Sequence, residues 1–397
     1  MTRVSRRQFI VGSSVLGALG VLGASAITWD ELQHRASATP LAAGSGILVV
    51  LTLYGGNDGI NTVIPYADNA YHDARPELSY RPEEVLHLDS QLGLNPAMKG
   101  MAGLWNSHNL AIVRGVGYPK PDHSHFRSME IWQTAVPDDP SPTGWIGRWL
   151  DATGEDPLRA VNIGSVLPTL AIGAKHTASA LDPASAPLTS AMRAELAALA
   201  ISDPRDSAAQ GFVCGGYRSE QTVSQTFSKV ESDRTKRGAN SLGAQLNLVS
   251  QCIKAGVPTR VYSVSLGGFD THAGERETQQ RQLGRVDEAV SGFLRDMAGH
   301  PRGRDVVLLA YSEFGRRVRA NASQGTDHGT AGPVFVAGMP VKGGFYGDEP
   351  SLTDLDDGDL KSTVDFRDIY NELLRRVVST DPGPVVGAGR RDLGLIA

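Results

Sequence analysis

The sequence predicts an α/β protein built on a doubly wound, mainly parallel β-sheet with helices on both faces. Residues 47–53 form a continuous apolar run, which is typical of a strand buried on both faces of a parallel sheet. Further apolar runs recur and alternate with segments of helical periodicity. At 397 residues, of which 20% are charged, the chain can bury a large core.

The individual elements follow from these patterns. Strands are predicted at residues 47–53, 110–116, 260–266, 306–310 and 333–337. A helical pattern starts near Phe126, with apolar residues at intervals of three. Two more amphipathic helices are predicted, at 242–253 and around 283–297. Residues 180–235 lack a strong period, and we expect them to form peripheral helices and loops.

The N-terminus carries the features of an export signal. Arg6 and Arg7 precede a mildly apolar, Gly-rich run, and small residues at 24–26 offer a cleavage site. We therefore expect a twin-arginine (Tat) signal peptide at residues 1–26, a linker at 27–45 and a single domain at 46–397. The Tat translocase would be a transient partner. The protein would then act in the periplasm, in the cell envelope or outside the cell.

Other classes of partner are not indicated. The net charge of −5 is spread along the chain without basic blocks, so the sequence gives no sign of nucleic-acid binding. Beyond the signal, no run approaches the length of a membrane span, so none is expected after cleavage. Cys214 and Cys252 could form one disulfide after export, or could be two separate buried thiols.

Reactive side chains gather in loops that adjoin the predicted strands. Parallel strands bring their carboxyl ends to one edge of a sheet, so these loops should meet there. We expect the site residues to be Asp58, His123, Ser124, His125, Asp270, His272, Glu313, Asp327 and His328. Imidazole and carboxylate groups together suit Zn²⁺, Mn²⁺ or Fe better than Ca²⁺.

Each of these residues also has a structural interpretation. Asp58 could cap its own turn, and Ser124 could be an ordinary helix N-cap rather than a nucleophile favoured by the helix dipole. Asp270 and His272 could belong to a solvated turn. Arg316 and Arg317 could clamp an oxyanion or be surface charges.

Five motifs in order resemble a bacterial, Tat-exported family known as domain of unknown function 1501. They are Gly55-Gly56-Asn57-Asp58-Gly59, His123-Ser124-His125-Phe126, Gly268-Phe269-Asp270-Thr271-His272, Ser312-Glu313-Phe314-Gly315-Arg316 and Asp327-His328-Gly329. More distantly, their order is similar to that of the alkaline phosphatase and sulfatase superfamily. The family resemblance also implies a possible exported protein partner.

The superfamily resemblance implies a metal-dependent hydrolase of phosphate or sulfate esters. It implies that Ser124 is the nucleophile, and we expect His125 and Arg316 to be further catalytic residues. A small-molecule or polymer ester would be the substrate. One or two divalent ions would serve as cofactors: Zn²⁺, Mn²⁺, Mg²⁺ or Ca²⁺.

The ligand sets implied by the resemblance are unequal. The first metal would have Asp270, His272 and His328, whereas the second would have Asp58 and Glu313 without an imidazole, because Phe314 stands where a histidine is expected. His123, His125 or Asp327 could substitute. If none does, the second site would favour Mg²⁺, Ca²⁺ or Mn²⁺, or would be lost. The alternative function is a non-catalytic secreted binding or assembly protein that keeps the fold with a degraded site.

Overall fold

The structure is a computed structural model of the full chain, and it describes five stretches of residues. These are residues 25–26, 38–154, 156–164, 166–181 and 241–397. The predicted signal peptide and Cys214 thus lie almost wholly outside the described residues, as do most of the predicted linker and of the segment 180–235. Cys252 is buried, and burial raises the pKa of its thiol to about 12.

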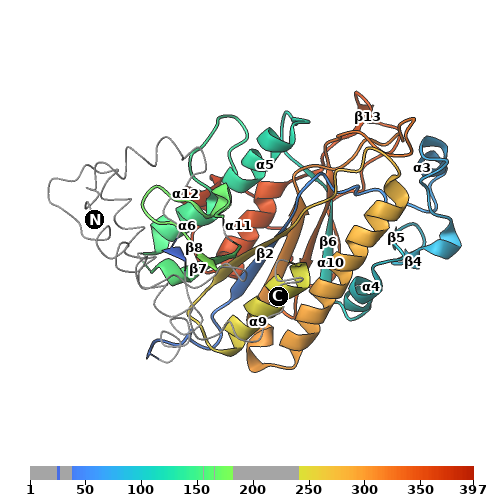
Figure 1. Cartoon of the computed structure of the whole chain (residues 1–397). Helices are drawn as coiled ribbons and strands as arrows, with labels where there is room; N and C mark the ends of the chain where they lie inside the picture. Colours follow the sequence, from blue (N-terminus) through green and yellow to red (C-terminus); the bar gives the residue numbers. More distant parts are fainter. Residues whose placement is uncertain (1–24, 27–37, 155, 165, 182–240) are drawn as a thin grey trace, which may run out of the picture.

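A mostly parallel sheet forms the centre of the molecule (Figure 1). Within the described stretches it has 10 strands, in the order β1-β8-β7-β9-β2-β10-β11-β6-β12, with β15 also pairing with β6. Their bounds are β1 Ser25–Ala26, β8 Ser179–Leu181, β7 Ala160–Ile163, β9 Val261–Leu266, β2 Ile47–Leu53, β10 Val306–Ser312, β11 Gly332–Ala337, β6 Leu110–Gly117, β12 Gly344–Tyr346 and β15 Val364–Asp365. The predicted α/β class is confirmed.

One strand runs against the others. β11 is antiparallel to both of its neighbours, β10 and β6. The reason is its connection: the chain returns from β10 through a loop, residues 313–331, that contains no crossover helix. The start of β11 therefore lies beside the carboxyl end of β10. A residue just before β11 can then meet residues that follow the parallel strands.

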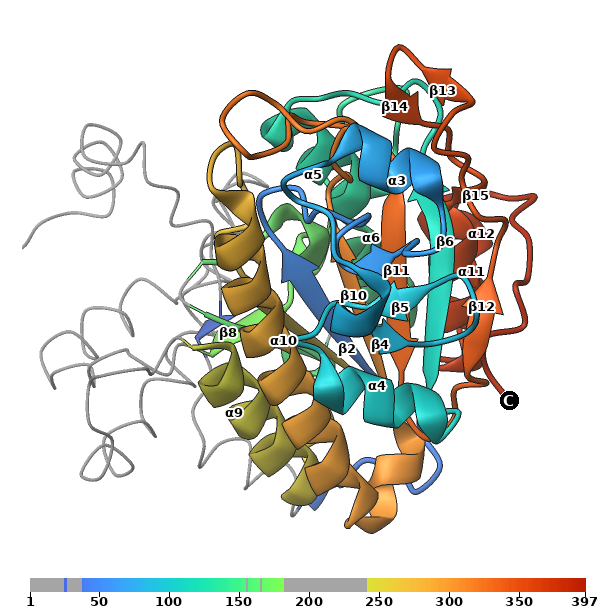
Figure 2. The ribbon, with the colours of Figure 1, turned by 90° about the vertical axis from the view of Figure 1, so that its right-hand side faces the viewer.

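Helices cover both faces of the sheet, as predicted (Figures 1 and 2). Alternate residues of β2 point to opposite faces, so Val49 packs in one core and Val50 in the other. The Val49 core includes residues of α4 (Lys99–Asn106), α9 (Leu242–Lys254) and α10 (Glu275–Ala298). The Val50 core includes residues of α5 (His125–Thr134), α6 (Trp145–Thr153), α11 (Phe366–Arg376) and α12 (Gly383–Val386).

Smaller elements complete the described part of the chain. A small sheet has the order β3-β5-β4, with bounds Val63–Ile64, Gly93–Leu94 and Leu86–His87. A hairpin joins β13 (Leu355–Asp356) to β14 (Asp359–Leu360), and α3 (Asn69–Ala74) lies near the small sheet (Figure 2). Short 3₁₀ turns occupy Pro82–Glu84, Pro157–Arg159, Thr169–Ala171 and Pro301–Asp305.

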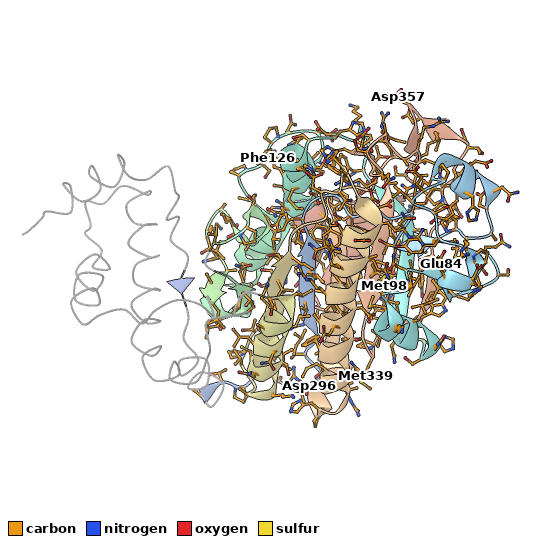
Figure 3. All side chains as sticks on the ribbon, turned by 45° about the vertical axis from the view of Figure 1, so that its right-hand side comes forward. Glu84, Met98, Phe126, Asp296, Met339 and Asp357 are labelled. Carbon is orange, nitrogen blue, oxygen red and sulfur yellow. The ribbon has the colours of Figure 1, made fainter. Side chains whose placement is uncertain are left out.

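The surface has few large apolar side chains. Among the described residues, Phe126 is 91% exposed, Val166 74% and Met339 48%. Figure 3 shows Phe126 at the rim of the molecule, on α5. Among the residues that the structure describes, no helix is both long enough and apolar enough to cross a membrane.

Candidate metal centre

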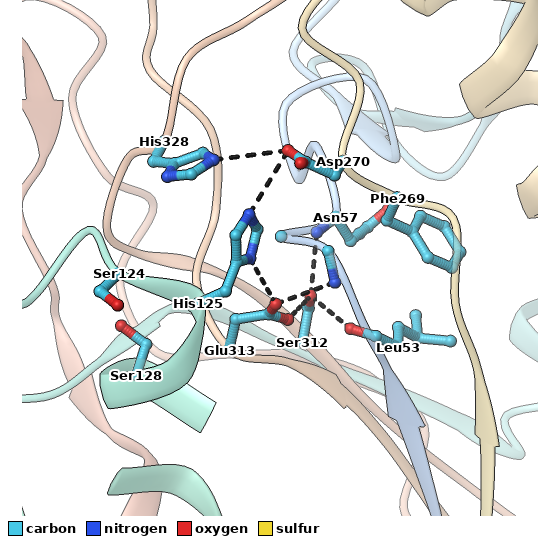
Figure 4. Close-up of polar contacts among 12 residues, drawn as sticks. Leu53, Asn57, Ser124, His125, Ser128, Phe269, Asp270, Ser312, Glu313 and His328 are labelled. Atoms are coloured by element: carbon cyan, nitrogen blue, oxygen red, sulfur yellow. Dashed lines mark hydrogen bonds and ion pairs between the residues drawn. The ribbon is translucent and has the colours of Figure 1, made fainter. Parts of the chain in front are cut away.

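Polar loops meet at the carboxyl edge of the parallel strands (Figure 4). Asp270 follows β9, Glu313 follows β10, and His125 opens α5 after β6. His328 precedes β11, whose reversed direction brings it to the same edge. Three side chains, His125, Asp270 and His328, present one ligand atom each within 4.8 Å of one another.

His125 is held in one orientation by a buried carboxylate. Its Nδ1 lies 2.8 Å from Oε1 of Glu313, a residue only 1% exposed. The same carboxylate accepts hydrogen bonds from the backbone N–H of Gly55 and the hydroxyl of Ser312, so its oxygens serve as acceptors here. Nδ1 of His125 therefore carries the proton. Its Nε2, which is buried and has no hydrogen-bond partner, keeps a free lone pair.

His328 is oriented in the same way by a different acceptor. Its Nδ1 lies 2.7 Å from the backbone carbonyl oxygen of His123, which can only accept. Nε2 of neutral His328 is thus also unprotonated, and it faces Oδ1 of Asp270 at 3.4 Å. Burial is the main cause that lowers the pKa of His328, so the neutral ring predominates at pH 7.

Asp270 is the common partner of the surrounding groups. Its Oδ1 lies 2.8 Å from Nη2 of Arg316, 2.9 Å from Nδ1 of His272 and 3.4 Å from Nε2 of His125. Burial opposes ionisation of Asp270, but Arg316, followed by His272 and His125, outweighs it and lowers the pKa of Asp270. The carboxylate is therefore charged at neutral pH.

This arrangement suits a cation. Two imidazole lone pairs and a carboxylate oxygen converge. With the proton of each neutral ring on Nδ1, neither Nε2 atom has a proton to donate to the carboxylate of Asp270. Two ligand atoms of one tetrahedral Zn²⁺ at about 2.0–2.1 Å would be separated by about 3.4 Å, and both imidazoles lie 3.4 Å from Asp270. A His₂-carboxylate set with Nδ1 atoms held by fixed acceptors is typical of bound Zn²⁺, Mn²⁺ or Fe²⁺.

His272 is a possible fourth ligand. Its ring centroid lies 4.7 Å from that of His328, and 45% of its side chain is exposed. The resemblance implied His272 in the first ligand set and His125 among the substitutes. In the structure, His125 belongs to the compact group, while His272 joins it through Asp270.

Asp58 is expected from the sequence to face this centre, but its carboxylate has a different partner. Its carboxylate is fully buried and lies 2.5 Å from Nη1 of Arg75. Burial opposes ionisation, but the Arg75 charge outweighs it and holds the pKa of Asp58 below its usual range. Asp58 is thus engaged in a buried ion pair and is not one of the three side chains that converge on the centre.

Glu275 completes this buried group. Burial, followed by the nearby Asp58 charge, raises the pKa of Glu275 to about 9, so it is a neutral acid at pH 7. Asp58 Oδ1 and Glu275 Oε1 are buried and accept from no other donor, and a proton on Glu275 that is shared with Asp58 satisfies both. Thr326 donates to the other oxygen of Glu275 at 2.5 Å.

Glu313 and Asp327 also have partners outside the group of three ligands, or behind it. Glu313 supports His125 through Nδ1, so it acts from behind the centre. Asp327 is exposed, and its Oδ1 accepts from the Asn321 amide at 3.1 Å within its own loop. Neither belongs to the group of three converging ligands, and their roles as direct metal ligands stay predictions.

Arg316 cannot clamp a substrate in this structure. Its side chain has no exposed surface, and its nitrogens donate to the backbone carbonyls of Gly55, Gly56, Phe269 and Thr326 as well as to Asp270. Its guanidinium fixes Asp270 and the loops around it. Arg317, 37% exposed, ion-pairs weakly with Asp357 and Asp359 instead.

Ser124 stands at the predicted helix start. It is the N-cap residue of α5, yet its exposed side chain makes no capping hydrogen bond. In Figure 4 its hydroxyl points toward Ser128, on the far side of His125 from Asp270. His123 is directed away as well, with its Nε2 2.6 Å from Asp359.

Phe314 occupies the place where the resemblance implied another histidine. It is buried, and its ring lies 4.9 Å from that of His125 and 5.0 Å from that of His328. An apolar ring therefore backs the centre on this side. With Asp58 held by Arg75, the described residues place one group of metal ligands here.

Sequence reasoning missed the buried partners of Asp58. Nothing in the sequence marked Arg75, because it belongs to none of the motifs, although it lies only 17 positions from Asp58. Glu275 could have been noticed as an acid in the first turn of a long helix, but that position is usually explained by the helix dipole.

The family comparison supports the resemblance over the second half of the chain. Residues 217–394 match the family model described as a protein of unknown function, DUF1501. This stretch carries the motifs around Asp270, Glu313 and His328. The motifs around Asp58 and His125 lie outside the match. A search of curated proteins finds no match.

Solved structures include several similar chains. A protein in the alkaline phosphatase superfamily from Vibrio parahaemolyticus is 12% identical, with a TM-score of 0.42, over 92% of this chain and 78% of that one. Lipoteichoic acid synthase LtaP from Listeria monocytogenes is 8% identical, with a TM-score of 0.41, over 93% and 82%. The periplasmic domain of EcEptC from Escherichia coli, in complex with Zn, is 12% identical, with a TM-score of 0.36, over 74% and 73%.

Proposed function

We propose that this protein is a metal-dependent hydrolase of phosphate or sulfate esters, with its ion held by His125, Asp270 and His328. The observation that carries the proposal is the position of the two Nε2 atoms, each 3.4 Å from the same carboxylate oxygen. His272 would be the fourth ligand or would leave that position to water. Open coordination positions are the property that separates catalytic metal sites from structural ones.

A divalent ion supplies Lewis-acid polarisation of the substrate and lowers the pKa of water that it binds. The chain's own residues prepare the site for it. Glu313 keeps the proton of His125 on Nδ1, and the His123 carbonyl does the same for His328. Arg316 holds Asp270 ionised and fixed in direction. The ligands are thus oriented before the ion or a substrate arrives.

Metal content and turnover test the proposal together. We expect purified full-length protein to bind about one divalent ion per chain, measured by inductively coupled plasma mass spectrometry, and to hydrolyse 4-nitrophenyl phosphate or sulfate. His328→Ala should lose both properties, because it removes a ligand. His176→Ala is the matched control. It alters a partly buried histidine whose backbone N–H donates to Asp151, and it should keep both the bound metal and the turnover. The proposal would be contradicted if the protein bound no divalent ion when micromolar metal was supplied.

Ser124 as the nucleophile stays a prediction with its own test. Support comes from its position directly before His125 and from its exposed hydroxyl, which makes no capping hydrogen bond. We expect Ser124→Ala to keep its metal and to lose at least about 100-fold in kcat. Full activity in this variant would assign the attack to water and would leave the metal proposal intact.

A non-catalytic binding protein is the second candidate function. The packing of Phe314 against His125 and His328 favours it, because the resemblance implied a second ligand set on this side. Stoichiometric metal without turnover on a broad panel of esters would support this alternative. A partner protein exported by the same route would then be sought among proteins retained by the metal-loaded chain.

Export by the Tat pathway is proposed from the residues before the domain. Arg6 and Arg7 carry this proposal. Replacing both by lysine should retain the precursor inside the cell, as detected by cell fractionation and by the mass of the accumulated chain. Export that is unchanged by this double substitution would contradict it.

A further inference from the structure

We infer that the centre selects monoanionic esters with an aromatic leaving group, and that Phe126 seats this group. Sulfate monoesters and phosphodiesters share this chemistry at neutral pH. The inference rests on the proposed function for the reaction, but the recognition of an aromatic monoanion can be tested without turnover. It depends on a pocket beside the metal ligands, on the charges that line it and on one exposed aromatic side chain.

The pocket opens directly onto the ligands. It has a volume of about 440 Å³, and its walls include the ligands His125 and Asp270 as well as Glu313. Its walls also include Tyr54 and one side of α5. The contributing helix residues are Phe126, Met129, Glu130 and Gln133. A group attached to an ester at the metal centre would therefore enter a space of the size of a small ring system.

Phe126 gives this wall an unusual surface. Its side chain is 91% exposed, and Figure 3 shows it at the rim of the molecule. A single exposed aromatic residue needs no special explanation by itself. This one, however, follows the ligand His125 directly and lines the same pocket. An aromatic ring bound there would cover part of it and gain stacking or edge-to-face contact.

The pocket lining contains no lysine or arginine among its described residues. Its acidic side chains are Glu130, Asp270 and Glu313. Glu130 is neutralised by Arg127, whose Nη1 lies 3.0 Å from it. The pocket lining therefore offers no unpaired cationic side chain that could bind a second negative charge on a substrate.

The buried Arg316 does not add a cation to the pocket either. Its side chain has no exposed surface, and its nitrogens donate to Asp270 and to backbone carbonyls. Among the described residues, a divalent ion would thus be the cationic group that meets the substrate, which favours a monoanion over a phosphate monoester dianion.

Ligand binding is the first test. Isothermal titration calorimetry on the full-length, metal-loaded protein would compare benzenesulfonate, methanesulfonate and phenylphosphonate at pH 8.5, where the last is a dianion. We expect benzenesulfonate to bind at least about tenfold more tightly than either of the others. Phe126→Ala should abolish the advantage over methanesulfonate. Val166→Ala, a matched control at another exposed apolar residue, should keep it.

The outcomes separate the two proposals. Equal affinities for the two sulfonates, tighter binding of the dianion, or an unchanged advantage in Phe126→Ala would overturn this inference. Benzenesulfonate binding as expected, together with no turnover of any ester, would support the recognition of aromatic monoanions and overturn the hydrolase. With turnover, Phe126→Ala should raise KM for 4-nitrophenyl sulfate about tenfold with a smaller change in kcat. Because Phe126 is exposed, this variant should fold like the wild type.

Discussion

At the residue scale, the buried carboxylate of Glu313 controls the metal centre without needing to touch the ion. Its Oε1 accepts hydrogen bonds from His125 and from the backbone N–H of Gly55, and its Oε2 lies 2.9 Å from the Ser312 hydroxyl, which also lies 2.7 Å from the Leu53 carbonyl oxygen. An amide in its place would keep one acceptor oxygen for His125 but would carry no charge. The orientation and basicity of His125 therefore depend on the charge of Glu313 as well as on its shape.

Glu313→Gln should weaken metal binding by about 10- to 100-fold, because outer-shell partners of ligating histidines have effects of this size. The dissociation constant for Zn²⁺ would be measured by competition with a chromophoric chelator. Glu130→Gln is the matched control, since Glu130 lines the same pocket but contacts Arg127. An affinity equal to that of the wild type in Glu313→Gln would contradict the supporting role of Glu313.

Glu275 gives a pH-dependent term in stability. Its pKa is raised from an ordinary 4.5 to about 9 in the folded protein. Between these values the folded state binds more protons than the unfolded state, so the free energy of unfolding should fall as pH rises through this window. Glu275→Gln, which keeps a neutral hydrogen-bonding group, should flatten this fall.

Urea unfolding at pH 5, 7 and 9 would measure the effect. Glu277→Gln is the control, because Glu277 lies in the same first turn of α10 with a side chain that is 90% exposed. The same pH dependence in Glu275→Gln and in the wild type would refute a protonated Glu275. A flatter dependence of stability on pH in Glu275→Gln would support a neutral Glu275 beside the charged Asp58.

At the element scale, the loop from β10 to β11 is the feature that builds the centre. Arg316 and His328 form an isolated antiparallel bridge across it, and the N–H of Gly329 donates to the carbonyl oxygen of Gly315 at 3.0 Å. This close pairing brings His328 back toward Asp270. The loop thus serves β10 with Glu313 and β11 with His328.

Gly329→Ala should damage this loop. A Cβ at this position would lie 2.5 Å from the backbone carbon of Arg316, which cannot move aside as a flexible side-chain end can. We expect a loss of about 1–3 kcal/mol in the free energy of unfolding, together with weaker metal binding. Gly103→Ala in α4 is the control, because its Cβ meets nothing within 4 Å and should stabilise the helix by about 0.5–1 kcal/mol. Chemical denaturation of both variants would decide.

The convergence of the loops could be predicted because it follows from strand direction alone. Apolar runs gave β2, β9 and β10, and the rule for parallel strands brought the residues after them to one edge. The destination of each side chain could not be predicted in this way. Asp58 lies at that edge, but it turns inward to Arg75, which α3 and its following loop deliver from outside the pattern. The reversal of β11 was also hidden, because strand periodicity is the same in both directions.

At the scale of the whole molecule, a bound ion would connect segments that are far apart in the chain. His125 opens α5 on one face of the sheet, Asp270 follows the central strand β9, and His328 precedes β11. Unfolding separates these segments and destroys the site. A ligand that binds only the folded state stabilises it by about 2.7 kcal/mol when its concentration is 100 times its dissociation constant.

The melting temperature should therefore depend on divalent metal. Removing the ion with EDTA should lower the melting temperature of the wild type, and adding Zn²⁺ or Mn²⁺ in excess should restore it by several degrees. Differential scanning calorimetry would measure both changes. A His125→Ala/Asp270→Ala double variant should melt at one temperature with or without EDTA, because it lacks two of the converging ligands. If chelator left the wild-type melting temperature unchanged while the metal analysis showed the ion removed, the ion would not connect these segments, and the protein's own contacts, such as those of Arg316 and Glu313, would hold the loops.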